Sequence, residues 1–410
     1  MATWNLDILS GLVQRLGAGL DALKQGDMDE ATSSATQKEL TTIAEEFIAT
    51  TSDPAQSVKD LARGYTASVA LKICLDLDLV HGFPDDGGHV TLSDLAGGMK
   101  ADEFVLGTVL NLLSNHGVFK NRGPSMWSHS ARSKTLLKPS FNDLMLSLLN
   151  ESFKSCFTLP ETLQKSQYQL PTPGHTAFNE YHHTDMDFYK YYATQDTVTG
   201  ARFQRAMAEV ASASLRFFEA AYPIQQLATC SLVVDVAGGA GYTSMFLAER
   251  LREQQFLVCD YASVVKQGKA QCPMHLRARI RYVAHDMFQH YDASSAGERG
   301  GRLFLLKQVL HDWSDAQCTS ILSNVLNVLH AGELLLIIDS VKPVENVSLS
   351  TSMSELLVMS TFGGRHRTYV ELEALVRNAR ADVSVRPSFA NAGQYDDFMV
   401  LEVQIYDDTR

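Results

Sequence analysis

The chain has 410 residues, of which 45% are hydrophobic, and a formal net charge of −12 at pH 7. This length is enough for two domains with cores of their own. The acidic balance argues against a nucleic-acid partner, because a phosphate backbone is bound by a basic surface. We find no run of about 18 apolar residues and therefore expect no membrane-spanning helix. The six cysteines are scattered without a CxxC pair, and the N-terminus lacks the pattern of a secretory signal, so we expect a cytoplasmic protein with reduced thiols.

The first half of the chain is predicted to be almost entirely helical. Apolar residues recur at helical spacing from about residue 36 to 215. Residues 91–122, followed by MWSHSARSKTLLK at 126–138, predict two helices and a short strand pair, which is a winged-helix arrangement. Its helices lack the Lys/Arg run of a DNA-binding surface. We therefore interpret residues 1–215 as a helical and winged-helix domain for dimerisation and for covering a substrate.

The second half alternates strands and helices. Apolar runs of strand length, such as SLVVDVAGG, QQFLVCD, GRLFLLKQVLHD and GELLLIIDSV, are separated by helical segments. This pattern predicts a Rossmann-like α/β domain over residues 216–410, with a doubly wound, mainly parallel sheet that binds ligands at the carboxyl ends of its strands. The last apolar run, DFMVLEVQIY, alternates and predicts an antiparallel edge strand.

A glycine-rich turn, VVDVAGGAG, follows the first of these strands. The strand ends near Asp235, and Gly238, Gly239 and Gly241 lead into the next helix. Glycines let the backbone approach a ligand closely, and the helix start offers free N–H groups. The stricter GxGxxG of dinucleotide oxidoreductases is absent, so a nicotinamide cofactor is not favoured.

Two later acids narrow the choice of ligand. Asp260 ends the second strand, where a carboxylate can accept hydrogen bonds from both ribose hydroxyls of a nucleoside. Asp286 ends the third strand beside Met287 and Phe288, a setting that suits the amino group of a stacked purine. Together with the glycine turn, this spacing is typical of a site for S-adenosylmethionine or S-adenosylhomocysteine.

The stretch LLKQVLHDWSDAQCTSIL at 305–322, with this turn upstream and GGRHRT at 363–368 downstream, resembles the plant- and fungal-type small-molecule O-methyltransferases over nearly the whole chain. The resemblance implies that His311 takes the proton of a substrate hydroxyl, chemistry suited to a neutral imidazole. It implies that Asp339 orients this imidazole and that Lys307 contacts the cofactor. It also implies a homodimer and a hydrophobic small-molecule substrate.

Two positions depart from the family pattern. The turn at 363–368 has His366 where the family has a glutamate that helps to hold the imidazole, and a second imidazole would repel an imidazolium. His129 stands on the predicted wing strand where the family has an aliphatic residue. Both departures resemble the pericyclases of pyridone-alkaloid (leporin-type) pathways, which use pocket histidines to polarise a ring carbonyl. The presence of His311 and Asp312, as in methyltransferases, counts against this interpretation.

The sequence therefore leaves three functions open. The departures favour a pericyclase, which would dehydrate and cyclise a polyketide- or pyridone-like intermediate by a hetero-Diels–Alder or ene-type reaction. The alternatives are a genuine O-methyltransferase with His311 as general base, and an inert cofactor-binding scaffold. The adjacent His182 and His183 do not indicate a metal site, because neighbouring side chains point apart. The expected pocket wall is apolar and consists of Phe157, Phe178, Met207, Met359 and Phe362.

Overall fold

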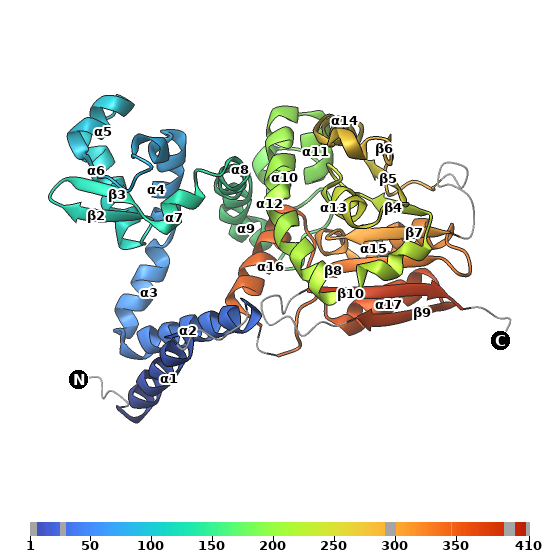
Figure 1. The fold of residues 1–410 in the computed structure, drawn as a ribbon, viewed down its shortest axis with the longest axis horizontal. Coiled ribbons are helices and arrows are strands. Elements are labelled where there is room, and N and C mark those ends of the chain that lie inside the picture. The colour runs from blue at the N-terminus through green and yellow to red at the C-terminus, as the bar shows by residue number, and fades with distance from the viewer. Residues whose placement is uncertain (1–5, 25–29, 292–300, 346, 389–397, 407–410) are drawn as a thin grey trace. The chain divides into compact units, whose positions relative to one another are not determined.

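The computed structural model describes residues 6–24, 30–291, 301–345, 347–388 and 398–406 (Figure 1). The described chain divides into two compact units, one that runs to Arg132 and one that begins at Ser133. Residues 133–215, which the sequence led us to group with the N-terminal domain, pack within the second unit. Among the described residues, no helix is both long enough and apolar enough to cross a membrane.

The first unit consists of helices followed by a small sheet. Helices α1 and α2 pack against each other, and the sheet has the antiparallel order β1-β3-β2. Thr91 and Asp102 cap helices α5 and α6 by accepting hydrogen bonds from backbone N–H groups in the first turn. Two helices followed by a strand pair form the winged helix that the sequence predicts. The elements are α1 (Leu6–Lys24), α2 (Glu30–Thr51), α3 (Pro54–Arg63), α4 (Tyr65–Asp76), β1 (Val90–Thr91), α5 (Leu92–Met99), α6 (Glu103–Asn115), β2 (Phe119–Gly123), β3 (Met126–His129) and α7 (Ala131–Thr135), the last of which crosses into the second unit.

The second unit opens with helices that precede its sheet. Helix α8 continues through a π-helical turn, η2, into α9, and α12 packs along α8. Asp187 and Asp196 cap α11 and α12. The elements are α8 (Pro139–Ser147), η2 (Leu148–Ser152), α9 (Phe153–Lys165), α10 (Ala177–His182), α11 (Phe188–Thr194) and α12 (Thr197–Ala221).

A seven-stranded sheet forms the centre of the second unit, with the order β6-β5-β4-β7-β8-β10-β9. The five strands from β6 to β8 are parallel, and β10 pairs antiparallel with both β8 and β9. The α/β fold with a mainly parallel sheet is therefore confirmed. The strands are β4 (Leu232–Val236), β5 (Gln255–Asp260), β6 (Ile280–Ala284), β7 (Arg302–Lys307), β8 (Leu334–Ser340), β9 (Val383–Ser388) and β10 (Phe398–Ile405).

The sequence prediction was wrong about the edge of this sheet. The final strand, β10, is antiparallel as expected, but it lies between β8 and β9, and β9 forms the edge. Strand β10 alternates less strictly than a half-exposed strand, since Val400 and Leu401 are both fully buried. Strand β9, whose sequence is VSVRPS, carries a proline and an arginine and so gave no strong strand signal.

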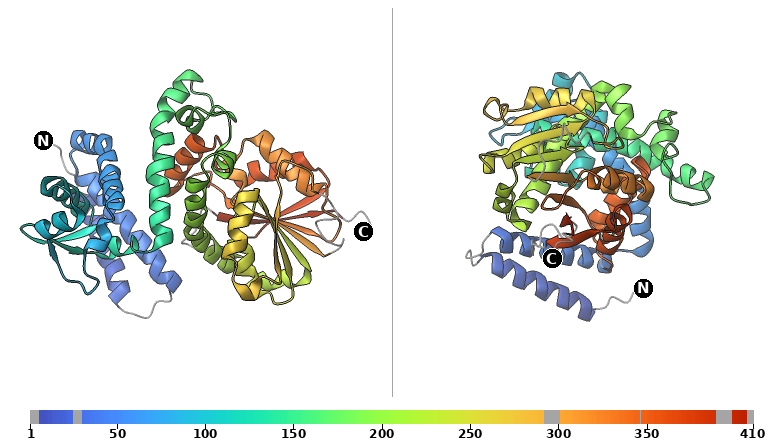
Figure 2. Two further views of the ribbon diagram at one scale, coloured as in Figure 1. Left: turned by 90° about the horizontal axis from the view of Figure 1, so that it is seen from above. Right: turned by 90° about the vertical axis from the view of Figure 1, so that its right-hand side faces the viewer.

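Helices cover both faces of the sheet, as Figure 2 shows in the left-hand view. Helix α12 contacts α13 and α14, and these two helices pack on strands among β4 to β6, whereas α15 and α17 pack together. The core between these layers is made of strand residues such as Val234, Phe304 and Ile337, which are completely buried. This two-sided burial explains the continuous apolar runs of the sequence. The remaining helices are α13 (Tyr242–Arg250), α14 (Ala262–Gln271), α15 (Asp315–Leu326), α16 (Leu349–Thr361) and α17 (Tyr369–Ala379).

A buried ion pair fixes the amino end of β7. Arg302 Nε and Nη2 donate to the two carboxylate oxygens of Glu333 at 2.7 and 2.8 Å. Arg302 and Glu333 are 2% and 1% exposed, and Glu333 also accepts a hydrogen bond from the backbone N–H of His330. The pair thus joins the start of β7 to the loop that leads into β8.

We expect Glu333→Ala to lower the free energy of unfolding by about 3–5 kcal/mol, because the Arg302 guanidinium would stay buried without its counter-ion. The exposed pair of Glu219 and Arg250 provides the control, and Glu219→Ala should cost at most about 1 kcal/mol. Urea titration followed by circular dichroism measures both. Equal, small effects of the two substitutions would contradict the assignment of a stabilising role to the buried pair.

Candidate active site

The glycine turn after β4 is tightly folded around Asp235. Gly239 and Gly241 adopt positive φ angles of 60° and 83°, a region that L-residues rarely adopt. A Cβ on Gly238 would lie 2.6 Å from the carboxyl carbon of Asp235, so only glycine fits there. Asp235 is buried and accepts a hydrogen bond from Ser244 Oγ at 2.6 Å. Burial raises the pKa of Asp235 to about 6.

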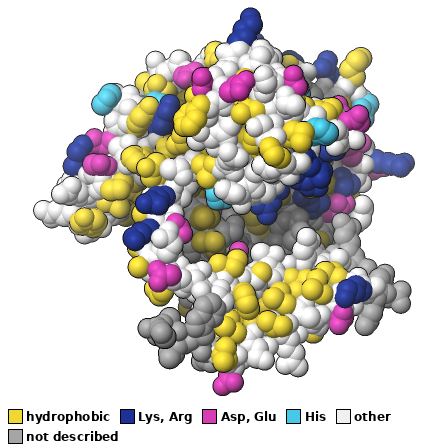
Figure 3. Space-filling view, turned by 90° about the vertical axis from the view of Figure 1, so that its left-hand side faces the viewer, with side chains coloured by type: hydrophobic (Ala, Val, Ile, Leu, Met, Phe, Trp, Pro, Cys, Tyr) yellow, Lys and Arg dark blue, Asp and Glu magenta, His cyan; other side chains and the backbone are white. Residues whose placement is uncertain are grey.

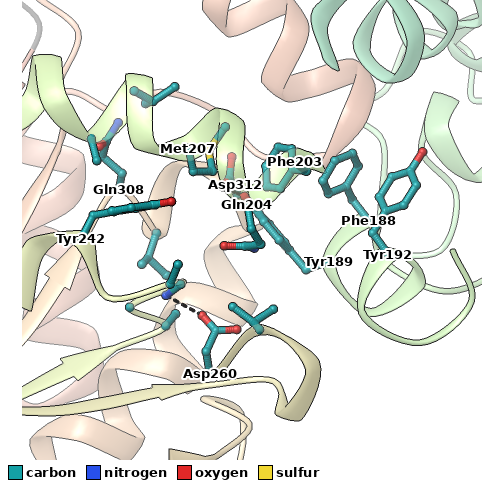
Figure 4. A pocket seen from close by; sticks show the side chains of 18 of the residues that line it. Phe188, Tyr189, Tyr192, Phe203, Gln204, Met207, Tyr242, Asp260, Gln308 and Asp312 are labelled. Atoms are coloured by element: carbon teal, nitrogen blue, oxygen red, sulfur yellow. Dashed lines mark hydrogen bonds between the residues drawn. The ribbon is translucent and has the colours of Figure 1, made fainter. Parts of the chain in front are cut away.

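Asp260 faces this turn from the end of β5. Its Oδ2 accepts a hydrogen bond from the backbone N–H of Gly239 at 2.8 Å, drawn as a dashed line in Figure 4, and its Oδ1 accepts one from the N–H of Tyr261 at 2.7 Å. Burial raises the pKa of Asp260 to about 6. The carboxylate is therefore preset in one orientation at the carboxyl end of the sheet, where the sequence predicts a ribose.

A large cavity of about 1090 Å³ opens beside this turn, and every residue that lines it belongs to the second unit. Most of the predicted cofactor residues are part of its wall. Gly241 instead is the N-cap residue of helix α13, and Phe288 packs edge-to-face on Trp313 at 4.9 Å and lines a smaller neighbouring pocket. The predicted cofactor residues in the wall are Asp235, Gly238, Gly239, Asp260, Asp286, Met287 and Lys307.

Lys307 is a half-buried cation at the end of β7. Its Nζ donates to Gln308 Oε1 at 2.5 Å. Burial lowers the pKa of Lys307 to about 8, although the nearby carboxylates of Asp235 and Asp339 oppose this effect. Gln308 has a positive φ of 55°, so the chain turns sharply immediately after the strand. This turn starts the segment that carries His311.

His311 and Asp339 form a short hydrogen-bonded pair. His311 lies in the turn η5 (Leu310–Asp312), and its Nδ1 is 2.5 Å from Asp339 Oδ1 at the end of β8. Asp339 also accepts hydrogen bonds from the backbone N–H groups of Leu310 and Ser340. Burial would raise the pKa of Asp339, but His311 and these hydrogen bonds lower it, so the carboxylate stays ionised.

The second nitrogen of His311 faces another acid. His311 Nε2 lies 3.3 Å from Asp312 Oδ1, and Asp312 Oδ2 accepts a hydrogen bond from Tyr189 Oη at 2.5 Å. Burial alone would lower the pKa of His311, but the carboxylates of Asp312 and Asp339 outweigh it and raise the pKa to about 9. At neutral pH the His311 imidazole is therefore protonated on both nitrogens and positively charged when no ligand is bound.

The turn at 363–368 packs directly on the His311 segment. A Cβ on Gly364 would lie 2.1 Å from the carbonyl oxygen of His311, so a side chain there would collide with backbone. Arg367 is 2% exposed and donates to the carbonyl oxygens of Leu310 and Trp313, both at 2.7 Å. Glycine and arginine in this turn thus hold the histidine loop in place.

His366 is part of the same turn and lines the cavity. It is 3% exposed, its Nε2 lies 3.3 Å from Ser354 Oγ, and its ring stands edge-to-face to the His311 ring at 5.7 Å. His366, which the sequence singles out, is therefore a buried neighbour of His311 rather than a surface residue.

The rest of the wall is largely aromatic and aliphatic. Figure 4 shows Phe188, Tyr189, Phe203 and Met207 around one part of the cavity. Of the expected wall residues, Met207 and Phe362 line the cavity. The others lie elsewhere: Phe178 is fully buried in an aromatic cluster with Phe188 and Tyr192, Phe157 is 66% exposed on α9, and Met359 lies on α16 outside the lining.

His129 lies in the first unit. It is 5% exposed at the end of β3, is paired across the strand with Phe119, and has its ring 5.3 Å from that of Phe83. The structure thus places it in the core of the winged helix, and its contact with a substrate stays a prediction.

Several residues of the site had no sequence signal that singled them out. Tyr189 and Gln204 come from helices α11 and α12, and only their contacts across the fold bring them to the cavity. Tyr189 lies in the aromatic-rich stretch 178–197, where a partner for Asp312 could not be identified from spacing alone. Within the part of the chain that the structure describes, no group of three His, Cys, Asp or Glu side chains could hold a metal ion.

Comparison with known proteins gives the class of this protein. A model of the O-methyltransferase domain matches residues 162–380, and one of the O-methyltransferase dimerisation domain matches residues 59–139. The O-methyltransferase SAT18 of Stachybotrys chartarum is 37% identical over 86% of each chain, and the O-methyltransferase penK of Penicillium thymicola is 27% identical over 85% of this chain and 80% of its own. The chain belongs to the O-methyltransferase family, as its sequence motifs predict.

Solved structures share the fold over nearly the whole chain. OxaC, solved in complex with S-adenosylhomocysteine and oxaline, has a TM-score of 0.82 at 18% identity and covers 97% of this chain and 99% of its own. LepI, solved in complex with S-adenosylmethionine, has a TM-score of 0.80 at 18% identity and covers 97% and 100%. The family depends on S-adenosylmethionine, which is the cofactor class that the sequence predicts.

Proposed function

We propose that this protein transfers the methyl group of S-adenosylmethionine to a hydroxyl of a flat, hydrophobic small molecule. The observation that carries this proposal is the pair of His311 and Asp339, in which the Nδ1 side of the imidazole is held by a buried carboxylate. Such a pair orients a general base and stabilises its protonated form. The names of two fungal relatives, the O-methyltransferases SAT18 and penK, support the same choice.

The residues around the glycine turn fit the cofactor. Cβ atoms at Gly238 and Gly241 would collide with Asp235 and Tyr282, so glycine allows the turn to fold this tightly beside the cavity. Asp260 is held by two backbone N–H groups in a position to accept hydrogen bonds from ribose hydroxyls. Asp286 and Met287 line the same cavity and would face the adenine. When bound, S-adenosylmethionine supplies a methyl group on a sulfonium, which is electrophilic without further activation.

The chain's own residues then provide the proton transfer. Neutral His311 would accept the proton of the substrate hydroxyl at Nε2, so that the hydroxyl oxygen could take the methyl group that the bound cofactor would supply. Asp339 stabilises the resulting imidazolium from the Nδ1 side. The apolar wall, including Phe203, Met207 and Phe362, excludes water and suits a planar polyketide- or pyridone-like ring.

A pericyclase is the second candidate, and one observation favours it. The two acids beside His311 raise its pKa to about 9, so at neutral pH the free enzyme presents a hydrogen-bond donor rather than a base. An imidazolium next to His366 could polarise a ring carbonyl and lower the barrier of a cyclisation. A cyclised or dehydrated product formed without methyl transfer would favour this second candidate.

We also propose that the protein is a homodimer. The dimerisation domain of the family covers residues 59–139, and large apolar side chains of the first unit are exposed, among them Leu61, Val58 and Phe104. Figure 3 shows a band of hydrophobic side chains in the lower part of the view. Such patches are typical of subunit interfaces.

Sedimentation velocity at micromolar concentration should give twice the 45.3 kDa chain mass, and a monomer would reject the proposal of a homodimer.

We expect Asp260→Ala to weaken binding of S-adenosylhomocysteine by roughly 1–3 kcal/mol, because charge-assisted hydrogen bonds to the ribose are lost. Affinity of the unmutated protein should also fall as the pH drops below about 6, where Asp260 becomes protonated. Titration calorimetry measures both effects, with Glu249→Ala on the exposed face of α13 as control. Absence of binding by the unmutated protein would contradict the cofactor assignment.

The pH profile separates the two candidate functions. If His311 is a general base, kcat/KM for methylation of a phenol of pKa near 10 should rise with pH up to about 9, because only the neutral imidazole accepts the proton. If His311 is a donor, cyclisation should be constant through neutral pH and fall above about 9. Labelled-methyl incorporation and product mass follow the two reactions. A methylation rate that does not change between pH 6 and 9 would contradict the role of His311 as base.

A further inference from the structure

Tyr189 connects the helix α11 to the acids around His311. Its hydroxyl donates to Asp312 Oδ2 at 2.5 Å, although the two residues lie 123 positions apart in the chain. Burial, followed by the charge of Asp312, raises the pKa of this phenol, so it remains a donor at all physiological pH values. The hydrogen bond is therefore always available to the carboxylate.

The ring of Tyr189 is held from several sides. It is stacked on Phe362 with an interplanar angle of 9° at 5.4 Å, and the rings of Trp313 and Phe203 lie at 6.0 and 6.1 Å. Phe188, its neighbour on α11, packs edge-to-face on the same Phe362. These contacts fix the direction of the hydroxyl without using it, so the phenol is preorganised toward Asp312.

Asp312 in turn faces the nitrogen of His311 that is not held by Asp339. The charged and titratable groups around the His311 imidazole are Asp339 at Nδ1, Asp312 at Nε2, Arg367 on the carbonyl groups of the same loop, and His366 with its ring at 5.7 Å. Burial raises the pKa of Asp312, and both His311 and the Tyr189 hydroxyl oppose this. Whether Asp312 is charged thus depends in part on Tyr189.

We propose that Tyr189 is a positioning residue, which keeps the Asp312 carboxylate ionised and oriented against His311 and so controls when the base can release or accept its proton. The inference rests on the proposed function of His311 as a base. The coupling between Tyr189, Asp312 and His311 can nevertheless be measured in the protein without a substrate. Tyr189 would act through Asp312 and not by contact with the reacting atoms. It also ties the protonation of the base to the correct packing of α11 over the cavity.

Removing only the hydroxyl, by Tyr189→Phe, tests this inference. Without the hydrogen bond, buried Asp312 should favour its neutral form, and a neutral Asp312 no longer stabilises the imidazolium. We expect the pKa of His311, about 9 in the unmutated protein, to fall by roughly 1 pH unit or more. The kcat/KM profile for methylation should move to lower pH by the same amount.

The measurement is a titration of the ligand-free protein, labelled in its histidine rings, by nuclear magnetic resonance. The signal of His311 is assigned by its loss in His311→Gln. The matched control is Tyr191→Phe, two positions along the same helix, whose ring packs on Phe178 and His182 and not on the acids. An unchanged His311 titration in Tyr189→Phe, or an equal shift in Tyr191→Phe, would overturn the proposal.

A double-mutant cycle tests whether the effect passes through Asp312. Asp312→Asn should lower the pKa of His311 by at least as much as Tyr189→Phe, and adding Tyr189→Phe to it should change nothing further. An additional shift in the double variant would contradict the route through Asp312. Because the titration needs no turnover, a protein that shows the shift but methylates no acceptor would disprove the proposed function and leave the role of Tyr189 standing.

Discussion

The short contact between His311 Nδ1 and Asp339 is the interaction on which the rest of the site depends. A histidine in a turn can point in several directions, and a buried carboxylate that already accepts two backbone N–H groups allows only one. The loop that carries His311 is itself braced by Arg367 and by the close approach of Gly364. The orientation of the His311 imidazole is thus fixed by backbone and core contacts.

The same topology brings the cofactor residues to this pair. Strands β4, β5, β7 and β8 are parallel neighbours. Their carboxyl ends therefore lie side by side, and these ends carry Asp235, Asp260, Lys307 and Asp339. Burial pushes the pKa values of Asp235 and Asp260 up and that of Lys307 down. At the carboxyl ends of these strands, a charge is therefore costly unless a ligand or a neighbouring group compensates it, as is typical of active sites.

The proposed function places two conflicting demands on His311. The acids on both sides make the imidazole a stable cation, whereas a general base must be neutral to accept a proton. A substrate hydroxyl of high pKa would then be methylated best at alkaline pH. The Tyr189–Asp312 contact would set the pKa of His311, and so the pH above which methylation is fast. His366 lies beside this cluster and adds no negative charge to it, so the cation is stabilised by Asp312 and Asp339 alone among the carboxylates named here.

Much of the fold could be predicted from the sequence because its signals are local. The apolar strand runs, the glycine turn and the winged helix each have a period or a turn residue of their own, whereas the position of β10 inside the sheet depends on long-range pairing. In the site, Asp235, Asp260, Lys307 and Asp339 lie at the carboxyl ends of strands and His311 follows one, so the sequence pattern could locate them. Tyr189 could not, because its role arises from packing of α11 against a loop 123 residues away. The aromatic residues Phe157 and Phe178 show the opposite error, since composition alone does not tell a pocket wall from a surface or a core.

The substitution Asp339→Asn tests the central claim most directly, because it retains the shape of the side chain and removes its charge. The measurement is the rate of labelled-methyl transfer to a panel of phenols and pyridones, with product mass as the readout and the affinity for S-adenosylhomocysteine as the control for folding. The account predicts a product one methyl group heavier with the unmutated protein, a loss in rate of about 10³–10⁴ with Asp339→Asn, and an unchanged cofactor affinity. A methylated product formed equally fast by both proteins, or an isomerised or dehydrated product with no methyl gain, would contradict it.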